Sequence, residues 1–183
     1  DVSGITRVTS TLPPPIEPVC TAATGPADPT ELMFDPDRVL QVSITMAPAD
    51  WDALRFQARD VYDTLGPTCM DGPPLSPYTE FPASLTIDGE TLSLVSVRKK
   101  GFYGSSDQFK PSLKLDLGEF VAGQTIGGLD RFTFNNARQD PALVKQCLGY
   151  ALFAAAGLPA SRCNFANVTV NGENLGVYVN VEE

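Results

Sequence analysis

The sequence predicts an α+β domain built mostly from antiparallel sheet with two main helices. Two observations predict this class. Several short segments alternate apolar and polar residues, as strands do, and two others join a helix-start signal to apolar residues at helical spacing. Hydrophobic residues make up 43% of the 183 residues, which is enough for one sizeable core. We therefore expect a single folded domain.

The first strand and the first helix are expected soon after Phe34. Residues 39–46 alternate apolar and polar side chains, which is typical of a half-buried strand. The helix is expected to begin between Ala47 and Asp50, with acidic residues in its first turn. Trp51 is expected to anchor it in the core.

Two hairpins and two further strands should complete the sheet. Asp88-Gly89 and Asn171-Gly172 are both typical of tight two-residue hairpin turns. The expected strands are residues 81–87, 91–98, 113–117, 131–134, 165–170 and 176–181.

The second helix is expected over residues 141–156. Asp140 would be its N-cap, and Pro141 would occupy the first helical position, where its missing N–H costs nothing. Gly157 would end the helix. Its apolar residues predict a broad buried face: Leu143, Cys147, Tyr150, Leu152 and Phe153.

Two segments have the composition of loops. Residues 1–33 form a Pro/Thr-rich leader or linker ahead of a domain over residues 34–183, and residues 63–80 are rich in proline and glycine. The chain shows no run of 18 or more apolar residues and no signal-peptide pattern at its start, so we expect no transmembrane segment and a mature form if the protein is exported.

The chain has four cysteines and no C-x-x-C pair. Two disulfides and export to an extracellular, cell-surface or periplasmic location are expected, while four buried thiols in a cytosolic protein are the alternative. Of the three possible pairings we prefer Cys147–Cys163 and Cys20–Cys69. The first would close a loop of about 15 residues, worth roughly 3 kcal/mol.

Charge and histidine content exclude several functions. The formal net charge is −9, which argues against nucleic acid or anionic lipid as a partner, because both require a basic surface. The chain has no histidine, so it cannot by itself form a Ser-His-Asp or Cys-His catalytic site.

A local basic patch stands out in this acidic chain. Five of the 13 basic residues fall within 17 positions: Arg98, Lys99, Lys100, Lys110 and Lys114. The even-numbered members could share one face of paired strands. The small residues of segment 101–106, Ser105 among them, would allow backbone N–H groups to approach a phosphate. The alternative is a solvated face that balances nearby carboxylates.

Four segments, in order, resemble the CotH kinase family of atypical spore-coat and surface protein kinases. They are residues 97–106 (VRKKGFYGSS), 110–116 (KPSLKLD), 134–141 (FNNARQDP) and 170–182 (VNGENLGVYVNVE). The resemblance runs from about Phe34 to Glu183. It implies a fold similar to the small lobe of an atypical protein kinase, truncated at a hinge over residues 178–183.

The resemblance also implies a function. The chain would be the N-terminal lobe of an exported, ATP-dependent Ser/Thr protein kinase that acts on surface or coat proteins, with ATP and Mg²⁺ as cofactors of the complete domain. The implied cofactor-binding residues are Arg98, Lys100, Ser105, Lys110, Lys114 and Glu182.

The sequence departs from the family pattern in two ways that matter for catalysis. Gln146 stands where family members often carry an acidic residue, and Pro111 stands where a second lysine is common. The family's catalytic acidic residues follow the hinge, so catalytic residues are unknown here and the chain alone is expected to be inactive.

Two functions therefore stand side by side. The alternative to the kinase lobe is a non-catalytic extracellular module for structural assembly or adhesion. On either reading the last strand is expected to present an open edge, to which a C-terminal lobe or a second copy would add.

Overall fold

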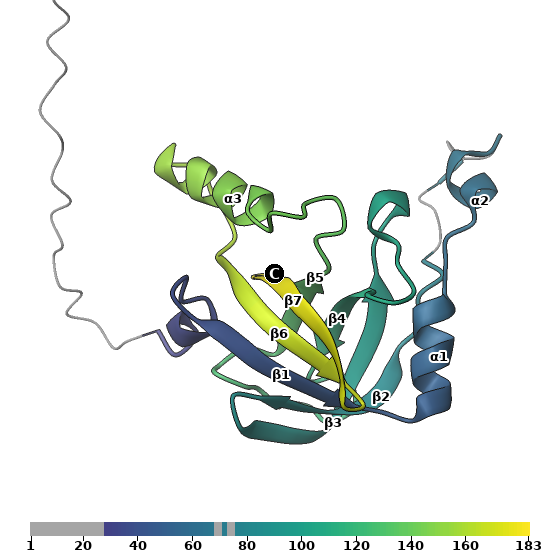
Figure 1. The fold of residues 1–183 in the computed structure, drawn as a ribbon, viewed down its shortest axis with the longest axis horizontal. Helices are drawn as coiled ribbons and strands as arrows, with labels where there is room; N and C mark the ends of the chain where they lie inside the picture. Colours follow the sequence, from purple (N-terminus) through teal and green to yellow (C-terminus); the bar gives the residue numbers. More distant parts are fainter. Residues whose placement is uncertain (1–27, 68–70, 73–75) are drawn as a thin grey trace, which may run out of the picture.

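The computed structural model describes residues 28–67, 71–72 and 76–183 of the chain. Their main element is a closed barrel of seven strands in the order β1-β2-β3-β4-β5-β7-β6 (Figure 1). The strands are β1 (Val39–Thr45), β2 (Phe81–Ile87), β3 (Glu90–Lys100), β4 (Ser112–Asp116), β5 (Arg131–Asn135), β6 (Cys163–Val170) and β7 (Glu173–Val181). The helices are α1 (Pro48–Phe56), α2 (Val61–Leu65), α3 (Lys145–Ala155) and two 3₁₀ turns, η1 (Glu31–Met33) and η2 (Tyr103–Ser105).

The expected α+β lobe with two main helices is therefore wrong. The sheet closes on itself because β1 bonds to β2 on one side and runs parallel to β6 on the other. Strand β7 likewise lies between β5 and β6, so the expected open edge at the last strand is also absent. A closed barrel satisfies the backbone groups of every strand in it, which an open sheet cannot do at its edges.

Apolar side chains alternate with polar ones along the strands and point into the barrel, so the core lies inside it. In β1 every second residue is buried and its neighbours are exposed, as the sequence predicted. Trp51 and Leu54 of α1 join this core, and they are 8% and 0% exposed. Both predicted hairpin turns are present, with positive φ angles at Asp88 and Asn171.

Helix α3 is shorter and more exposed than expected. It begins at Lys145 because Leu143 adopts a φ of +60°, which breaks a helix that would start at Pro141. Asp140 is therefore not the N-cap residue, although its Oδ2 accepts a hydrogen bond of 2.6 Å from the backbone N–H of Lys145.

The expected buried face of α3 is also absent. None of its residues is buried, because the helix lies beyond the end of the barrel (Figure 1), and its exposed apolar side chains include Leu148, Leu152 and Phe153. The predicted disulfide Cys147–Cys163 joins it to the start of β6, with the Cα atoms 5.4 Å apart. The other expected pair, Cys20–Cys69, lies outside the described residues.

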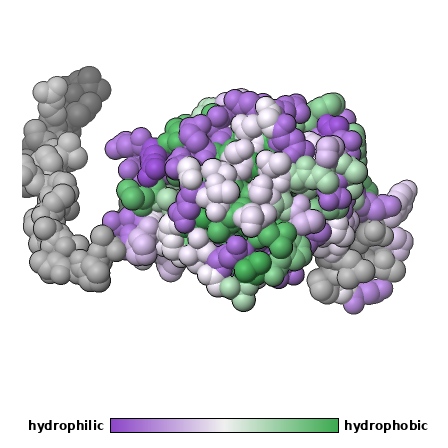
Figure 2. Space-filling model, turned by 90° about the horizontal axis from the view of Figure 1, so that it is seen from below, coloured by the Kyte–Doolittle hydropathy of each residue, from purple (hydrophilic) through white to green (hydrophobic). Residues whose placement is uncertain are grey.

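The face seen in Figure 2 is a mosaic of hydrophilic and hydrophobic side chains, with the hydrophobic ones in small groups. Such scattering is ordinary for a protein surface. None of the helices in the described part of the chain is long and apolar enough to cross a membrane.

Candidate functional site

The basic residues of β3 lie on both faces of the barrel wall. Lys99 faces inward beside the buried Leu113 of β4, and it is 2% exposed. Arg98 and Lys100 face outward, and Arg98 lies directly opposite Lys114 of β4. The shared parity of these three outward residues predicted their common face.

Lys114 is held by a carboxylate at the end of the described chain. Its Nζ lies 2.7 Å from Oε2 of Glu183, and the hydroxyl of Thr133 on β5 donates a hydrogen bond of 2.5 Å to Glu183 Oε1. Burial would raise the pKa of Glu183, but the hydrogen bonds from Lys114 and Thr133 and the charges of Lys114 and Lys100 hold it below its usual value. A lysine–carboxylate pair is thus present, although Gln146 cannot supply it.

A cleft of about 540 Å³ opens beside this pair at the end of β3, β4 and β5. We name it the Lys100 cleft. Its lining includes Lys100, Ser105, Asn135, Arg138, Lys145 and Gln146. The loop before α3 and the first turn of α3 form one wall, and the amides of Asn135 and Gln146 hydrogen-bond each other there at 3.0 Å.

The ammonium group of Lys100 has no hydrogen bond or ion pair within the part of the chain that the structure describes, although the side chain is partly buried. Burial lowers its pKa, and the charges of Lys114 and Arg98 lower it further, while Glu183 opposes them. A partly buried ammonium with no bonded partner is a position where an anion would be stabilised.

The charge of the cleft is mixed but mainly positive. Arg138 and Lys145 line it with Lys100, and Asp140 is the acidic member. Asp140 Oδ1 is buried without a hydrogen-bond partner among the described residues. Arg138 is already paired with Asp107 at 3.4 Å, and Lys145 Nζ donates a hydrogen bond of 3.3 Å to the carbonyl of Gln139. Lys100 is therefore the cation of the cleft that lacks a bonded partner among the described residues, and Asp140 Oδ1 is an oxygen that could accept a hydrogen bond.

Ser105 and Arg98 were both predicted to bind a cofactor, and in the structure both bind other residues of the chain. Ser105 lines the Lys100 cleft, but its Oγ accepts a hydrogen bond of 3.0 Å from the backbone N–H of Phe102. The same turn needs glycine at position 101, where φ is +128° and a Cβ would lie 2.7 Å from Ser105 Oγ. Arg98 pairs with Glu80 at 3.1 Å, outside the cleft.

Lys110 and Glu182 are not brought to the cleft. Lys110 Nζ donates a hydrogen bond of 2.7 Å to the carbonyl of Val177 and lies 4.9 Å from the centre of the Tyr178 ring, at the barrel end. Glu182 is bound by Arg162, with Nη2 to Oε1 at 2.5 Å and Nε to Oε2 at 3.0 Å.

Sequence reasoning missed Glu183 and Lys145. The sequence signal for Glu183 was its parity with Val179 and Val181, and the structure shows that these two residues pair with the outward residues of β5. Lys145 could not be placed from the sequence, because its position depends on where α3 begins.

No group of three or more histidine, cysteine, aspartate or glutamate side chains able to hold a metal ion occurs within residues 28–67, 71–72 and 76–183.

Comparison with known proteins identifies the part of the chain that carries the cleft. Residues 97–183 match the family model described as CotH kinase protein. A protein of Bacillus subtilis (strain 168) named inner spore coat protein H-like protein is 37% identical over 54 residues, which make up 29% of this chain and 18% of that protein. The match therefore spans less than a fifth of that relative's length. These two findings support the family resemblance expected from the sequence: residues 97–183 are similar to the CotH family.

Proposed function

We propose that the Lys100 cleft binds the phosphates of ATP, and that the chain is the phosphate-binding part of a protein kinase that phosphorylates Ser or Thr of surface or coat proteins. The observation that carries this proposal is Lys100. Its partly buried ammonium lines a cleft of about 540 Å³ and lacks a bonded partner among the described residues.

The other cleft residues suit a polyphosphate. Arg138 and Lys145 add two cations on the opposite wall from Lys100, so a chain of phosphates could be contacted from both sides. The amides of Asn135 and Gln146 could donate to oxygens that the cations leave open. Lys114 lies on the neighbouring strand, and Glu183 fixes its ammonium beside the cleft.

ATP, when bound, supplies the phosphoryl group that is transferred. Lys100 and Lys145 would neutralise its phosphate oxygens, and the pairing with Glu183 would keep Lys114 charged and oriented. Phosphoryl transfer also uses Mg²⁺ held by carboxylates. The described residues contain no group of three or more histidine, cysteine, aspartate or glutamate side chains placed to hold an ion, so the proposal is confined to phosphate binding.

Location and acceptor are part of the proposal. The relative's name refers to the inner spore coat, and we extend a coat or surface association to this chain. The Cys147–Cys163 disulfide supports an oxidising environment, since such bonds persist mainly in exported proteins.

The test is calorimetric titration of the chain with ATP, in the presence and absence of Mg²⁺. Lys100→Met should weaken binding by about 10- to 100-fold, because it removes a charge-assisted hydrogen bond worth roughly 1.5–3 kcal/mol. Arg38→Gln is the matched control. It also removes an exposed cation, which pairs with Asp88 at the opposite end of β3, and it should leave ATP binding unchanged.

Equal ATP affinity of Lys100→Met and the unchanged chain would overturn the proposal. A non-catalytic assembly or adhesion module would then be the better account. The exposed apolar side chains of α3 are the observation that favours this alternative.

A further inference from the structure

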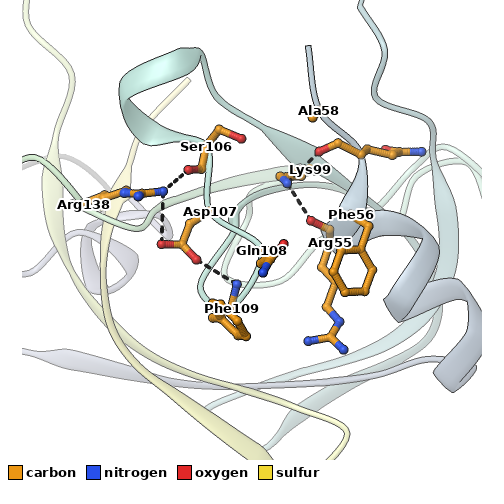
Figure 3. A pocket seen from close by; sticks show the side chains of 10 residues that line it. Arg55, Phe56, Ala58, Lys99, Ser106, Asp107, Gln108, Phe109 and Arg138 are labelled. Carbon is orange, nitrogen blue, oxygen red and sulfur yellow. Dashed lines mark hydrogen bonds and ion pairs between the residues drawn. The ribbon is translucent and has the colours of Figure 1, made fainter. Parts of the chain in front are cut away.

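A second cleft lies on the other side of the β3 wall. It has a volume of about 270 Å³ and opens between the end of α1 and the loop over residues 106–109. We name it the Lys99 cleft, after the inward-facing lysine at its base (Figure 3). The proposed function does not use this cleft, although Arg138 lines both clefts.

Lys99 is a buried cation with incomplete hydrogen bonding. It is 2% exposed, and its Nζ donates to the backbone carbonyls of Arg55 at 2.6 Å and Gln57 at 2.7 Å. An ammonium group has three N–H donors, and the described residues accept from two. Both acceptors are neutral carbonyls, so neither of them neutralises the buried charge.

The acid nearest to Lys99 is already engaged. Asp107 Oδ1 accepts backbone hydrogen bonds from Phe109 at 2.7 Å and from Lys110 at 3.0 Å, and Oδ2 lies 3.4 Å from Nη1 of Arg138. Figure 3 shows the contacts of Asp107 with Phe109 and Arg138. Three cations, Lys99, Lys110 and Arg138, therefore gather around one carboxylate at this end of the barrel, which leaves the site positive.

The rim of the cleft is aromatic. Phe56 and Phe109 both line it, and they are 56% and 71% exposed although they are large apolar side chains. The guanidinium of Arg55 lies 4.7 Å from the centre of the Phe56 ring and pairs with Asp52 at 2.7 Å, so one face of that ring is covered by a neutralised cation. Exposed rings beside a buried cation offer apolar contact next to a charge.

We propose that the Lys99 cleft binds a carboxylate carried on an aromatic or bulky apolar group. The carboxylate would accept the remaining N–H of Lys99, and Phe56 and Phe109 would cover the apolar group. Such a ligand supplies a second negative charge beside Asp107, whose oxygens are already bound, and apolar cover for the rim. It could be a free small acid or the carboxylate of a peptide next to an apolar side chain.

The probe for the test is phenylacetate, followed by the backbone amide resonances of a ¹⁵N-labelled chain. We expect saturable shifts confined to residues 55–58 and 106–109. Acetate, which has no ring, and 2-phenylethanol, which has no charge, should each bind at least about tenfold more weakly, because each lacks one of the two contacts.

Two variants keep the proposal testable. Lys99→Met should abolish the shifts, and Phe109→Ser, at an exposed position that cannot affect the core, should weaken phenylacetate binding severalfold while the spectrum stays folded. Lys100→Met is the control on the opposite face of the same strand. It should leave phenylacetate binding unchanged even where it impairs ATP binding, so failure of either proposal is recognised separately.

The absence of saturable shifts at residues 55–58 and 106–109 would overturn the inference. Equal binding of acetate and phenylacetate, or unchanged binding in Phe109→Ser, would also overturn it, because the aromatic contact would then contribute nothing. N-acetylphenylalanine, with its neutral amide as the control without charge, distinguishes a peptide carboxylate from a free small acid as the natural ligand. Tighter binding of the acid than of phenylacetate supports a peptide carboxylate, and weaker binding supports a small acid.

Discussion

Glu183 lies 2.7 Å from Lys114, so the outer face of the barrel contains a lysine–carboxylate pair that the helix sequence had seemed to exclude. Gln146 occupies the position on α3 from which a carboxylate was expected, and it bonds Asn135 instead. The pair places a fixed cation next to the partly buried Lys100. Four predictions follow from this pair and from the contacts of its neighbours.

The first prediction concerns the acid itself. Glu183→Gln should lower the free energy of unfolding at pH 7 by about 0.5 kcal/mol, the usual size for a pair that remains partly exposed. The folded protein holds the pKa of Glu183 below its usual value, so its contribution to stability is present above the usual pKa and is lost as the pH falls through the lowered pKa. Denaturant unfolding between pH 7 and 3 should show a shallower acid loss in Glu183→Gln. An unchanged pH profile would contradict the pairing.

The second prediction concerns Lys114. Lys114→Ala should weaken ATP binding by about tenfold, because it removes a cation beside the cleft. Arg131→Ala is the matched control, since Arg131 pairs with Asp116 on the same outer face, and its charge, unlike that of Lys114, is not among those that shift the pKa of Lys100. Equal losses in the two variants, measured by calorimetry, would show a general effect of charge and not a specific contact.

The third prediction separates Glu182 from its neighbour. Burial would raise the pKa of Glu182, but the hydrogen bonds and the charge of Arg162 hold it below its usual value, and Arg162 also reaches Asp28 at 3.1 Å. Glu182→Gln should therefore lower the free energy of unfolding by about 1 kcal/mol, as expected for a partly exposed charge network. ATP affinity should stay the same. If Glu182→Gln kept the free energy of unfolding of the unchanged chain but bound ATP more weakly, Glu182 would belong to the ATP site after all.

The fourth prediction concerns the disulfide. Helix α3 has no buried residue, so Cys147–Cys163 is its main covalent anchor to the barrel. Cys147→Ser with Cys163→Ser should cost up to about 3 kcal/mol in the loop-entropy model. Hydrogen exchange should show loss of protection in α3 while β1 to β7 stay protected, and ATP affinity should fall because Lys145 and Gln146 lose their fixed place. Equal loss of protection in α3 and in the barrel strands would contradict the expectation that α3 opens independently of the barrel.

The elements with local signals could be predicted from the sequence. Both hairpin turns, the alternation of β1 and the shared face of Arg98, Lys100 and Lys114 depend on neighbours in sequence or on a period of two. The closure of the barrel could not be predicted in this way. The pairing of Val39 with Phe165 joins residues 126 positions apart, and no local pattern specifies it.

The errors at α3 have a different cause. Its apolar residues have helical spacing, which predicts a helix but does not say whether another element covers its face. The start was misplaced because Leu143 adopts a left-handed conformation that its residue type does not favour. The position of Lys145 in the Lys100 cleft therefore could not be predicted from the sequence.

The central claim is that Lys100 contacts the phosphates of ATP, and the spectrum of the lysine side-chain ammonium groups tests it most directly. Binding should shift the Lys100 Nζ resonance saturably and raise its pKa, which burial and the nearby cations lower in the free protein. The Lys110 resonance should stay in place, because its ammonium is bound to the carbonyl of Val177. A Lys100 resonance that does not move at saturating ATP would contradict the account.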